Sequence, residues 1–234
     1  MLRQILEKAA RQYRGDSYRI DPDIPESALI GFGLRRMLGR IRSLVHGRGF
    51  RKAFLSENVK LRNRRFISFG NGVTLGRGVS IDGLSRSGVR LGHCVNIGAY
   101  SIIEATGVLS KLGEGCSIGK NSALGPFSYI GAAGGVTIGE DVIMGQRVSF
   151  HAENHVHDRT DIPIRMQGVK RKGIVIGDDC WIGSNSIFLD GAHVGRGCVI
   201  GAGSVVRGEI PPYSVAAGVP ARVIRSRKMD ENAS

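Results

Sequence analysis

Three of the six histidines in this 234-residue chain lie in one short segment, HAENHVHDRTDIPIRMQGVKRKG at 151–173. A neutral imidazole can take a proton from a hydroxyl or an amine near neutral pH, and it can also bind a metal ion. A zinc site is disfavoured, because the segment contains no cysteine and no clear set of further ligands. The segment therefore predicts general-base catalysis without a metal, and His151, His155 and His157 are the histidines to weigh.

A six-residue repeat surrounds this segment. Ile182 to Val199 reads as IGSNSI, FLDGAH and VGRGCV: an aliphatic lead residue, often followed by Gly, with a small residue three positions after that Gly. This period fits neither a helix nor simple strand alternation, and it is typical of a solenoid. The lead positions are Phe69, Leu75, Ile81, Leu91, Ile97, Ile103, Leu112, Ile118, Leu124, Ile130, Ile138, Met144, Phe150, Ile176, Ile182, Phe188, Val194, Ile200 and Val206.

Each hexad is interpreted as a short strand plus a corner, with its lead side chain pointing into a narrow prism. Three such sides close one coil, so the repeat predicts a mainly β protein, a parallel β-helix of about six triangular coils. We expect three parts: a basic, partly helical extension or cap at 1–66, the β-helix at 67–210 and a tail at 211–234. The loop at 151–175 interrupts the repeat for longest, and long loops on rigid scaffolds often carry catalytic residues.

The N-terminal part is strongly basic, with 16 Lys and Arg against six Asp and Glu in residues 1–66. Residues 1–15 are predicted to be helical, and residues 26–46 form a basic amphipathic pattern. One interpretation is a cap that covers the open end of the solenoid. The other is an interfacial helix in peripheral contact with anionic lipid. Nucleic-acid binding is disfavoured, because no aromatic residues alternate with the basic ones and no known motif is present.

Composition gives the expected compartment. No apolar run could span a bilayer, and the start of the chain lacks the apolar segment of a secretory signal, so we expect a cytoplasmic protein that can lie at the inner face of the membrane. Cys116, Cys180 and Cys198 occupy small interior hexad positions, and Cys94 lies one residue before such a position. We expect buried, reduced thiols rather than disulfides or a zinc site.

Hexads of this form resemble those of the hexapeptide-repeat acyltransferases, and the resemblance covers roughly residues 69–227. It implies a left-handed β-helix. The string NHVHDRTDIPIRMQG, together with the hexads from Gly173 to Arg227, is similar to the maltose, galactoside and polysaccharide O-acetyltransferase branch. There the first His of the loop motif is the base, which implies His155 here. Asn154, His157 and Asp158 are then acceptor-side candidates, with His157 where a second, non-essential His occurs.

The same resemblance implies acetyl-CoA as co-substrate, bound in a groove along the corners of neighbouring coils, and a cyclic homotrimer with active sites between subunits. The implied coenzyme A contacts are Trp181, Gly183, Ser184, Gly201, Ala202, Gly203, Val206, Arg207, Arg222 and Arg225. Trp181 follows an inward position and should face outward. Arg222 and Arg225 suit the phosphates, although an ordinary solvated tail remains an alternative.

The acceptor is expected to be a sugar hydroxyl of a cell-surface polysaccharide or its precursor. Ala132 and Ala133 stand where small-sugar enzymes of the branch carry acidic residues, which favours a larger acceptor. The alternatives are an N-acetyltransferase of an amino-sugar nucleotide, a serine-type O-acetyltransferase, and a carbonic-anhydrase-like or non-enzymatic solenoid.

Overall fold

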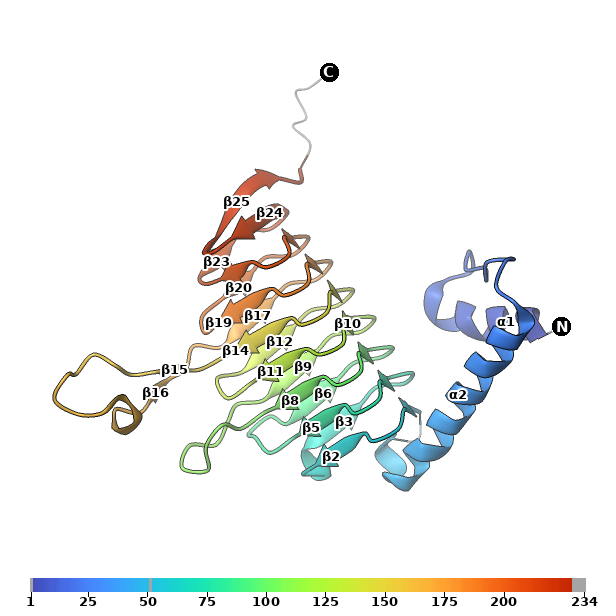
Figure 1. The fold of residues 1–234 in the computed structure, drawn as a ribbon, viewed down its shortest axis with the longest axis horizontal. Coiled ribbons are helices and arrows are strands. Elements are labelled where there is room, and N and C mark those ends of the chain that lie inside the picture. Colours follow the sequence, from blue (N-terminus) through green and yellow to red (C-terminus); the bar gives the residue numbers. More distant parts are fainter. Residues whose placement is uncertain (1, 51, 229–234) are drawn as a thin grey trace, which may run out of the picture.

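The computed structural model describes residues 2–50 and 52–228, and its main body is a solenoid of short parallel strands (Figure 1). Successive strands take turns on three sheets, so the solenoid is a three-sided prism. The first side contains β1 (Phe54–Leu55), β4 (Thr74–Leu75), β7 (Asn96–Ile97), β10 (Ala123–Leu124), β13 (Ile143–Met144), β18 (Trp181–Ile182), β21 (Val199–Ile200), β24 (Ser214–Gly218) and β25 (Ala221–Ser226).

The other two sides have seven strands each. The second contains β2 (Lys60–Arg62), β5 (Ser80–Asp82), β8 (Ile102–Glu104), β11 (Tyr129–Gly131), β14 (Ser149–His151), β19 (Ile187–Leu189) and β22 (Val205–Val206). The third contains β3 (Ile67–Phe69), β6 (Val89–Leu91), β9 (Cys116–Ile118), β12 (Val136–Ile138), β17 (Ile174–Ile176), β20 (His193–Val194) and β23 (Glu209–Ile210). The solenoid therefore has seven complete coils, one more than the repeat predicted.

The solenoid also extends beyond both predicted boundaries. Strands β1 and β2 pair in parallel with β4 and β5, so the first coil lies inside the range 1–66 that was assigned to the extension. At the other end, β24 pairs with β21 and β25 folds back antiparallel on β24, so residues 214–226 continue the first side. Residues 229–234 of the predicted tail lie outside the described residues.

The lead residues form the interior of the prism. Seventeen of the nineteen predicted lead residues are buried, and the rings of Phe150 and Phe188 stack at 4.8 Å between centroids. Phe69 is partly buried against the core, whereas Leu112 is wrongly assigned, because it lies in the loop between β8 and β9. This ladder of aliphatic side chains supplies most of the buried apolar surface, the main stabilising term in folding.

The three corners differ. At the first corner, between the first and second sides, a glycine ends each first-side strand from β4 to β21, and the coils approach so closely that a Cβ on Gly98 would lie 2.3 Å from the nitrogen of Pro126. At the corner between the second and third sides, named the loop corner here, the connections are longer. The insertions at 83–88, 105–115 and 152–173 all leave the prism there.

Two helices precede the prism. Helix α1 (Leu2–Arg14) packs against α2 (Glu26–Val45), and α2 packs against β1 (Figure 1). Gly39 allows this contact, because a Cβ there would already lie 3.2 Å from the carbonyl oxygen of Leu55. The 3-10 turns η1 (Arg48–Phe50), η2 (Arg64–Phe66) and η3 (Ile164–Met166) complete the structure. Among the described residues, neither helix combines the length and the apolar character that a bilayer-spanning segment needs.

Candidate active site

The loop at 152–173 is an ordered hairpin and not a flexible insertion. Strand β15 (Asn154–His155) pairs antiparallel with β16 (Val169–Lys170), and His155 lies opposite Val169. Near the tip, the Gln167 side chain donates to the carbonyl of Arg159 at 2.8 Å and accepts from its N–H at 3.0 Å. The hairpin projects from the loop corner, away from the body of the prism (Figure 1).

Buried ionic contacts anchor the foot of the hairpin. The Arg171 side chain is only 6% exposed, and it donates to Glu153 at 2.7 Å and to the carbonyl of Leu112 at 3.0 Å. Asp190 accepts from the N–H groups of Lys172 and Gly173, each at 2.8 Å. The Glu153–Arg171 pair thus joins the two ends of the hairpin, and its C-terminal end is attached to the 105–115 loop and to Asp190, which favours a constant position for a catalytic residue.

The His155 side chain is exposed, and within the described ranges its ring forms no hydrogen bond. His157 turns back toward it, with Nδ1 3.1 Å from the backbone oxygen of His155. The two carboxylates nearest in sequence have other partners: Glu153 binds Arg171, and Asp158 binds Lys170 at 2.9 Å. The Lys170 ammonium lowers the pKa of Asp158. Neither carboxylate orients the imidazole, so both ring nitrogens are available for proton transfer.

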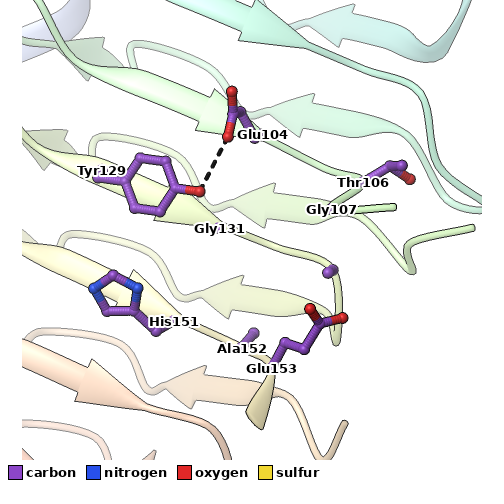
Figure 2. A pocket seen from close by; sticks show the side chains of 9 residues that line it. Glu104, Thr106, Gly107, Tyr129, Gly131, His151, Ala152 and Glu153 are labelled. Atoms are coloured by element: carbon purple, nitrogen blue, oxygen red, sulfur yellow. Dashed lines mark hydrogen bonds between the residues drawn. The ribbon is translucent and has the colours of Figure 1, made fainter. Parts of the chain in front are cut away.

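A pocket opens at the foot of the hairpin (Figure 2). Glu104, Gly131 and His151 end neighbouring strands of the second side in register, and the missing side chain of Gly131 leaves room for the Tyr129 ring, which a Cβ there would approach to 3.0 Å. Its lining is Glu104, Thr106, Gly107, Tyr129, Gly131, Ala133, His151, Ala152 and Glu153. Loop-corner side chains therefore converge on one hollow.

Tyr129 is the central polar group of this pocket. Its ring lies 5.6 Å from that of His151, and its hydroxyl donates to Glu104 at 3.0 Å (Figure 2). Partial burial and the adjacent Glu104 carboxylate raise the pKa of Tyr129 to about 12, so the hydroxyl stays protonated at neutral pH. The pocket thus presents two carboxylates and the lone pairs of the Tyr129 hydroxyl as acceptors, together with an imidazole, which is chemistry suited to the hydroxyl groups of a polyhydroxyl ligand.

The predicted coenzyme A contacts lie mainly at the first corner. Trp181 is 59% exposed on β18, which confirms its predicted outward orientation. A Cβ on Gly183 would lie 2.4 Å from the nitrogen of Ala202, and one on Gly201 would lie 2.7 Å from Cβ of Ala217. Small residues therefore expose a strip of backbone. Gly183, Gly201 and Gly203 donate their N–H groups to the ladder, whereas those of Ser184 and Ala202 have no acceptor among the described residues.

Two of the implied arginines continue this strip. Arg222 pairs with Ala217 on β24. Arg225 lies in register with Val215 on β24, Val199 on β21 and Trp181 on β18. Both arginine side chains are exposed on β25. The strip of small residues thus leads from Gly183 toward two cations on the same side of the prism.

Two other implied contacts do not join this strip. The sequence places Val206 near the adenine end of the coenzyme, but its side chain is fully buried in the prism interior, so only its backbone can face a coenzyme. Arg207 is exposed, but it follows β22 at the loop corner and not at the first corner. His155 belongs to the hairpin on the loop corner as well. Within one chain, the candidate base and the candidate coenzyme strip lie at different corners.

The interior cysteines match the expectation of free thiols. Cys116, Cys180 and Cys198 are buried and free. Burial raises the pKa of Cys116 to about 12 and that of Cys180 to about 11, which makes both poor nucleophiles. No group of three or more His, Cys, Asp or Glu side chains in the described part of the chain has the arrangement of a metal site.

Glu104, Tyr129 and His151 were missed as pocket residues from sequence. The available signal was the position directly after the lead residue. On the first side, the residue directly after the lead residue is Gly in each coil from Gly76 to Gly201. On the second side, Glu104 and His151 stand at that position. Ala132 and Ala133 stand where small-sugar enzymes of the branch carry acidic residues, and both are buried. The acidic residues that line the pocket are Glu104 and Glu153.

Comparison with known proteins agrees with this fold. Residues 173–208 match the family model described as bacterial transferase hexapeptide (six repeats). The chain is 34% identical over 176 residues to the probable acetyltransferase Rv3034c of Mycobacterium tuberculosis, across 75% of this chain and 56% of that protein. It is 30% identical over 172 residues to WbbJ, the putative lipopolysaccharide biosynthesis O-acetyl transferase of Escherichia coli, across 70% and 74%.

A shorter match links the chain to galactoside O-acetyltransferase of Escherichia coli, with 44% identity over 92 residues, 38% of this chain and 43% of that protein. Thus the chain spans about half the length of two of these three relatives. The fold and these relatives place the chain among the hexapeptide-repeat transferases. More specifically, the chain belongs to the hexapeptide-repeat acetyltransferase family.

Solved structures show the same fold. A hexapeptide-repeat acetyltransferase from Vibrio cholerae, VCA0836, aligns with a TM-score of 0.52 and 28% identity over 58% of this chain and 73% of that one. The putative acetyltransferase BC4754 from Bacillus cereus aligns with a TM-score of 0.56 and 24% identity over 76% and 85%. The prism is therefore the left-handed parallel β-helix expected from sequence.

Proposed function

We propose that the protein is an acetyl-CoA-dependent O-acetyltransferase that acts on a sugar hydroxyl of a cell-surface polysaccharide or its precursor. The observation that carries this proposal is an imidazole without a hydrogen-bond partner, His155, on an anchored hairpin beside a pocket of hydrogen-bonding groups. The names of two relatives, a lipopolysaccharide biosynthesis O-acetyl transferase and a galactoside O-acetyltransferase, support a sugar hydroxyl as acceptor.

The proposed reaction is direct transfer. His155 takes the proton of the acceptor hydroxyl while the oxygen attacks the thioester carbonyl of acetyl-CoA. The N–H of Ser184, which has no acceptor within the described residues, donates to the oxygen that gains negative charge. His155 then returns the proton to the departing thiolate. A covalent acyl-cysteine is disfavoured, because Cys180 is buried and its raised pKa keeps it protonated.

The pocket at the foot of the hairpin is proposed as the acceptor site. Sugar hydroxyls both donate and accept hydrogen bonds, and the Glu104 and Glu153 carboxylates are acceptors that such a ligand can use. The Tyr129 ring, tilted toward His151, offers an apolar face of the kind that packs against a sugar ring. Asn154, His157 and Asp158 extend this surface along the hairpin.

The active site is proposed to form between subunits of a homotrimer. His155 extends from the loop corner, whereas Trp181, Gly183 and Ser184 lie at the first side and its corner. A second prism set against the first would bring one subunit's hairpin to its neighbour's coenzyme strip, and a cyclic arrangement repeats this contact with no unpaired site. Exposed apolar side chains at the first side and its corner, Ile143, Trp181 and Phe127, suit such a contact.

The test compares two neighbouring histidines. His155→Gln is expected to lower acetyl transfer about 10²- to 10⁴-fold, because a general base contributes that much. His157→Gln, on the same hairpin, is the matched control and should lose less than about tenfold. Thiol release from acetyl-CoA is followed with polysaccharide fragments, free sugars, amino-sugar nucleotides and serine as acceptors.

Three outcomes would overturn the proposal. A His155→Gln enzyme with full activity would exclude the assigned base. Turnover with amines alone would replace O-acetylation by N-acetylation. Failure of the wild-type protein to bind coenzyme A would indicate a non-catalytic solenoid.

A further inference from the structure

The face of α2 that points away from the prism is apolar. Leu29, Gly39 and Ser43 are its buried residues, and Gly39 contacts β1. The residues at 30, 34, 37, 41 and 44 recur at spacings of three and four, so they share one face, opposite the buried one. Together with their neighbours they form the α2 stripe, whose exposed members are Ile30, Leu34, Met37, Leu38, Ile41, Leu44 and Val45.

This exposure is large for seven side chains on one helix. Each is between 43% and 81% exposed, whereas singly scattered apolar residues are the norm on protein surfaces. Side-chain contacts attach the helix to the first coil: Arg42 binds Glu57 at 3.1 Å, and the guanidinium of Arg36 lies 3.7 Å from the centre of the Phe54 ring. The stripe is therefore presented by a helix whose other face is fixed to the first coil.

The charged residues beside the α2 stripe indicate what kind of surface it binds. Arg42 beside the stripe is already paired with Glu57, but Arg35 flanks the stripe on that side and Arg40 on the other, and Glu26 is the only acidic residue in α2. Two α2 stripes packed on each other would set these arginines together without acidic partners. An anionic lipid surface instead accepts the apolar side chains between its headgroups and pairs the arginines with phosphates.

We propose that α2 docks this protein on anionic membrane surfaces, with the stripe among the lipid headgroups and the prism held in water. The helix lies along the membrane and does not cross it, consistent with its basic flanks and mixed composition. The first 66 residues add long-range attraction, since their 16 basic residues exceed the acidic ones by ten.

Vesicle flotation of the full-length chain tests this proposal. The wild-type protein is expected to float with vesicles of phosphatidylcholine containing about one third phosphatidylglycerol, and not with phosphatidylcholine alone. Raising the salt concentration from about 0.15 M to about 1 M should weaken binding, because the Debye length falls from about 8 Å to about 3 Å.

Two pairs of variants separate the apolar and charged contributions. Leu34→Ser/Ile41→Ser keeps the net charge and should weaken binding about tenfold or more, whereas Val108→Ser/Val175→Ser removes two exposed apolar side chains elsewhere and should not. Arg35→Gln/Arg40→Gln should also weaken binding at least about tenfold, because each basic residue near the surface adds to the attraction. Arg90→Gln/Arg196→Gln, with the same change in net charge on exposed positions of the prism, is its control.

Circular dichroism and thermal unfolding of each variant show whether the chain still folds. Equal flotation of the stripe variants and their controls would overturn the proposal. So would a wild-type protein that stays unbound on anionic vesicles while Leu34→Ser/Ile41→Ser lowers its oligomeric mass, since the stripe would then cover a second copy of the chain.

Discussion

The interior thiols are chemically silent because the prism desolvates them. Cys116, whose pKa is raised to about 12, would carry a thiolate in only about one molecule in ten thousand at pH 8, against a sizeable fraction for an ordinary thiol. Iodoacetamide at pH 8 should therefore leave Cys116 and Cys180 unmodified in the native protein, with activity retained. Both should react after denaturation, and peptide mass spectrometry distinguishes the two states. Loss of activity on native alkylation of Cys180, with protection by coenzyme A, would instead indicate a nucleophilic cysteine.

Asp190 is a second buried group with a defined structural role. Its carboxylate accepts N–H bonds from Lys172 and Gly173, where the hairpin rejoins the prism. Asp190→Ala leaves those donors without partners and should lower the free energy of unfolding by about 2–4 kcal/mol. The control is Asp178→Ala: Asp178 also accepts a backbone N–H, from Glu140 at 2.8 Å, but it is exposed and should cost at most about 1 kcal/mol. Urea unfolding measures both, and equal losses would exclude the anchoring role.

The sequence predicts the burial of single residues well where the position in the hexad alone decides whether a side chain faces the core. The burial of Ile182 and Phe188 and the exposure of Trp181 follow from the hexad position alone. The pocket did not follow, because it depends on alignment across coils. Glu104 and His151 lie 47 positions apart in sequence, and only the lengths of the intervening loops bring them into register on either side of Gly131.

At the scale of elements, the stacked corners leave no room for side chains. A Cβ on Gly98 would lie 2.3 Å from the nitrogen of Pro126 in the next coil, and backbone cannot move aside as a side chain can. Gly98→Ala should therefore lower the free energy of unfolding by about 1–3 kcal/mol. Gly107→Ala is the matched control: its Cβ would meet only side-chain atoms at 3.5 Å or more, and its effect should stay within about 0.5 kcal/mol. Thermal unfolding measures both variants, and equal shifts of their midpoints would contradict this account.

The sequence patterns predicted some helices and strands and missed others. Helix α2 and nearly all strands between Phe69 and Val206 lie where the sequence placed them. The first coil was missed because β2 carries Lys60 and Arg62 on either side of its single buried residue, Leu61, so charge hides the repeat. Strands β24 and β25 were missed because β25 pairs antiparallel, and no hexad describes a strand that reverses direction.

At the scale of the whole molecule, the two halves of the proposed site do not meet within one chain. The hairpin with His155 leaves the loop corner, and the strip from Gly183 to Arg222 follows the first side and its corner. Two inactive variants can therefore restore each other. His155→Ala lacks the proposed base, and Ala202→Trp, at an exposed first-corner position, fills the proposed coenzyme groove.

Mixed trimers of these two variants provide the measurement. If each site takes its histidine from one subunit and its coenzyme groove from the next, random mixing of equal amounts gives about one intact site in four, so about a quarter of wild-type activity should return. Each variant alone should stay inactive. A chain that carries both changes, mixed with wild-type chains, measures the change in activity that subunit exchange alone produces. Co-expression with two affinity tags isolates the mixed trimers, each of which contains one intact site in three, so about a third of wild-type activity is expected in that fraction. Because a site contained in one chain cannot be rebuilt by mixing, activity at the average of the two inactive variants would refute the shared site and leave the choice of His155 to its own test.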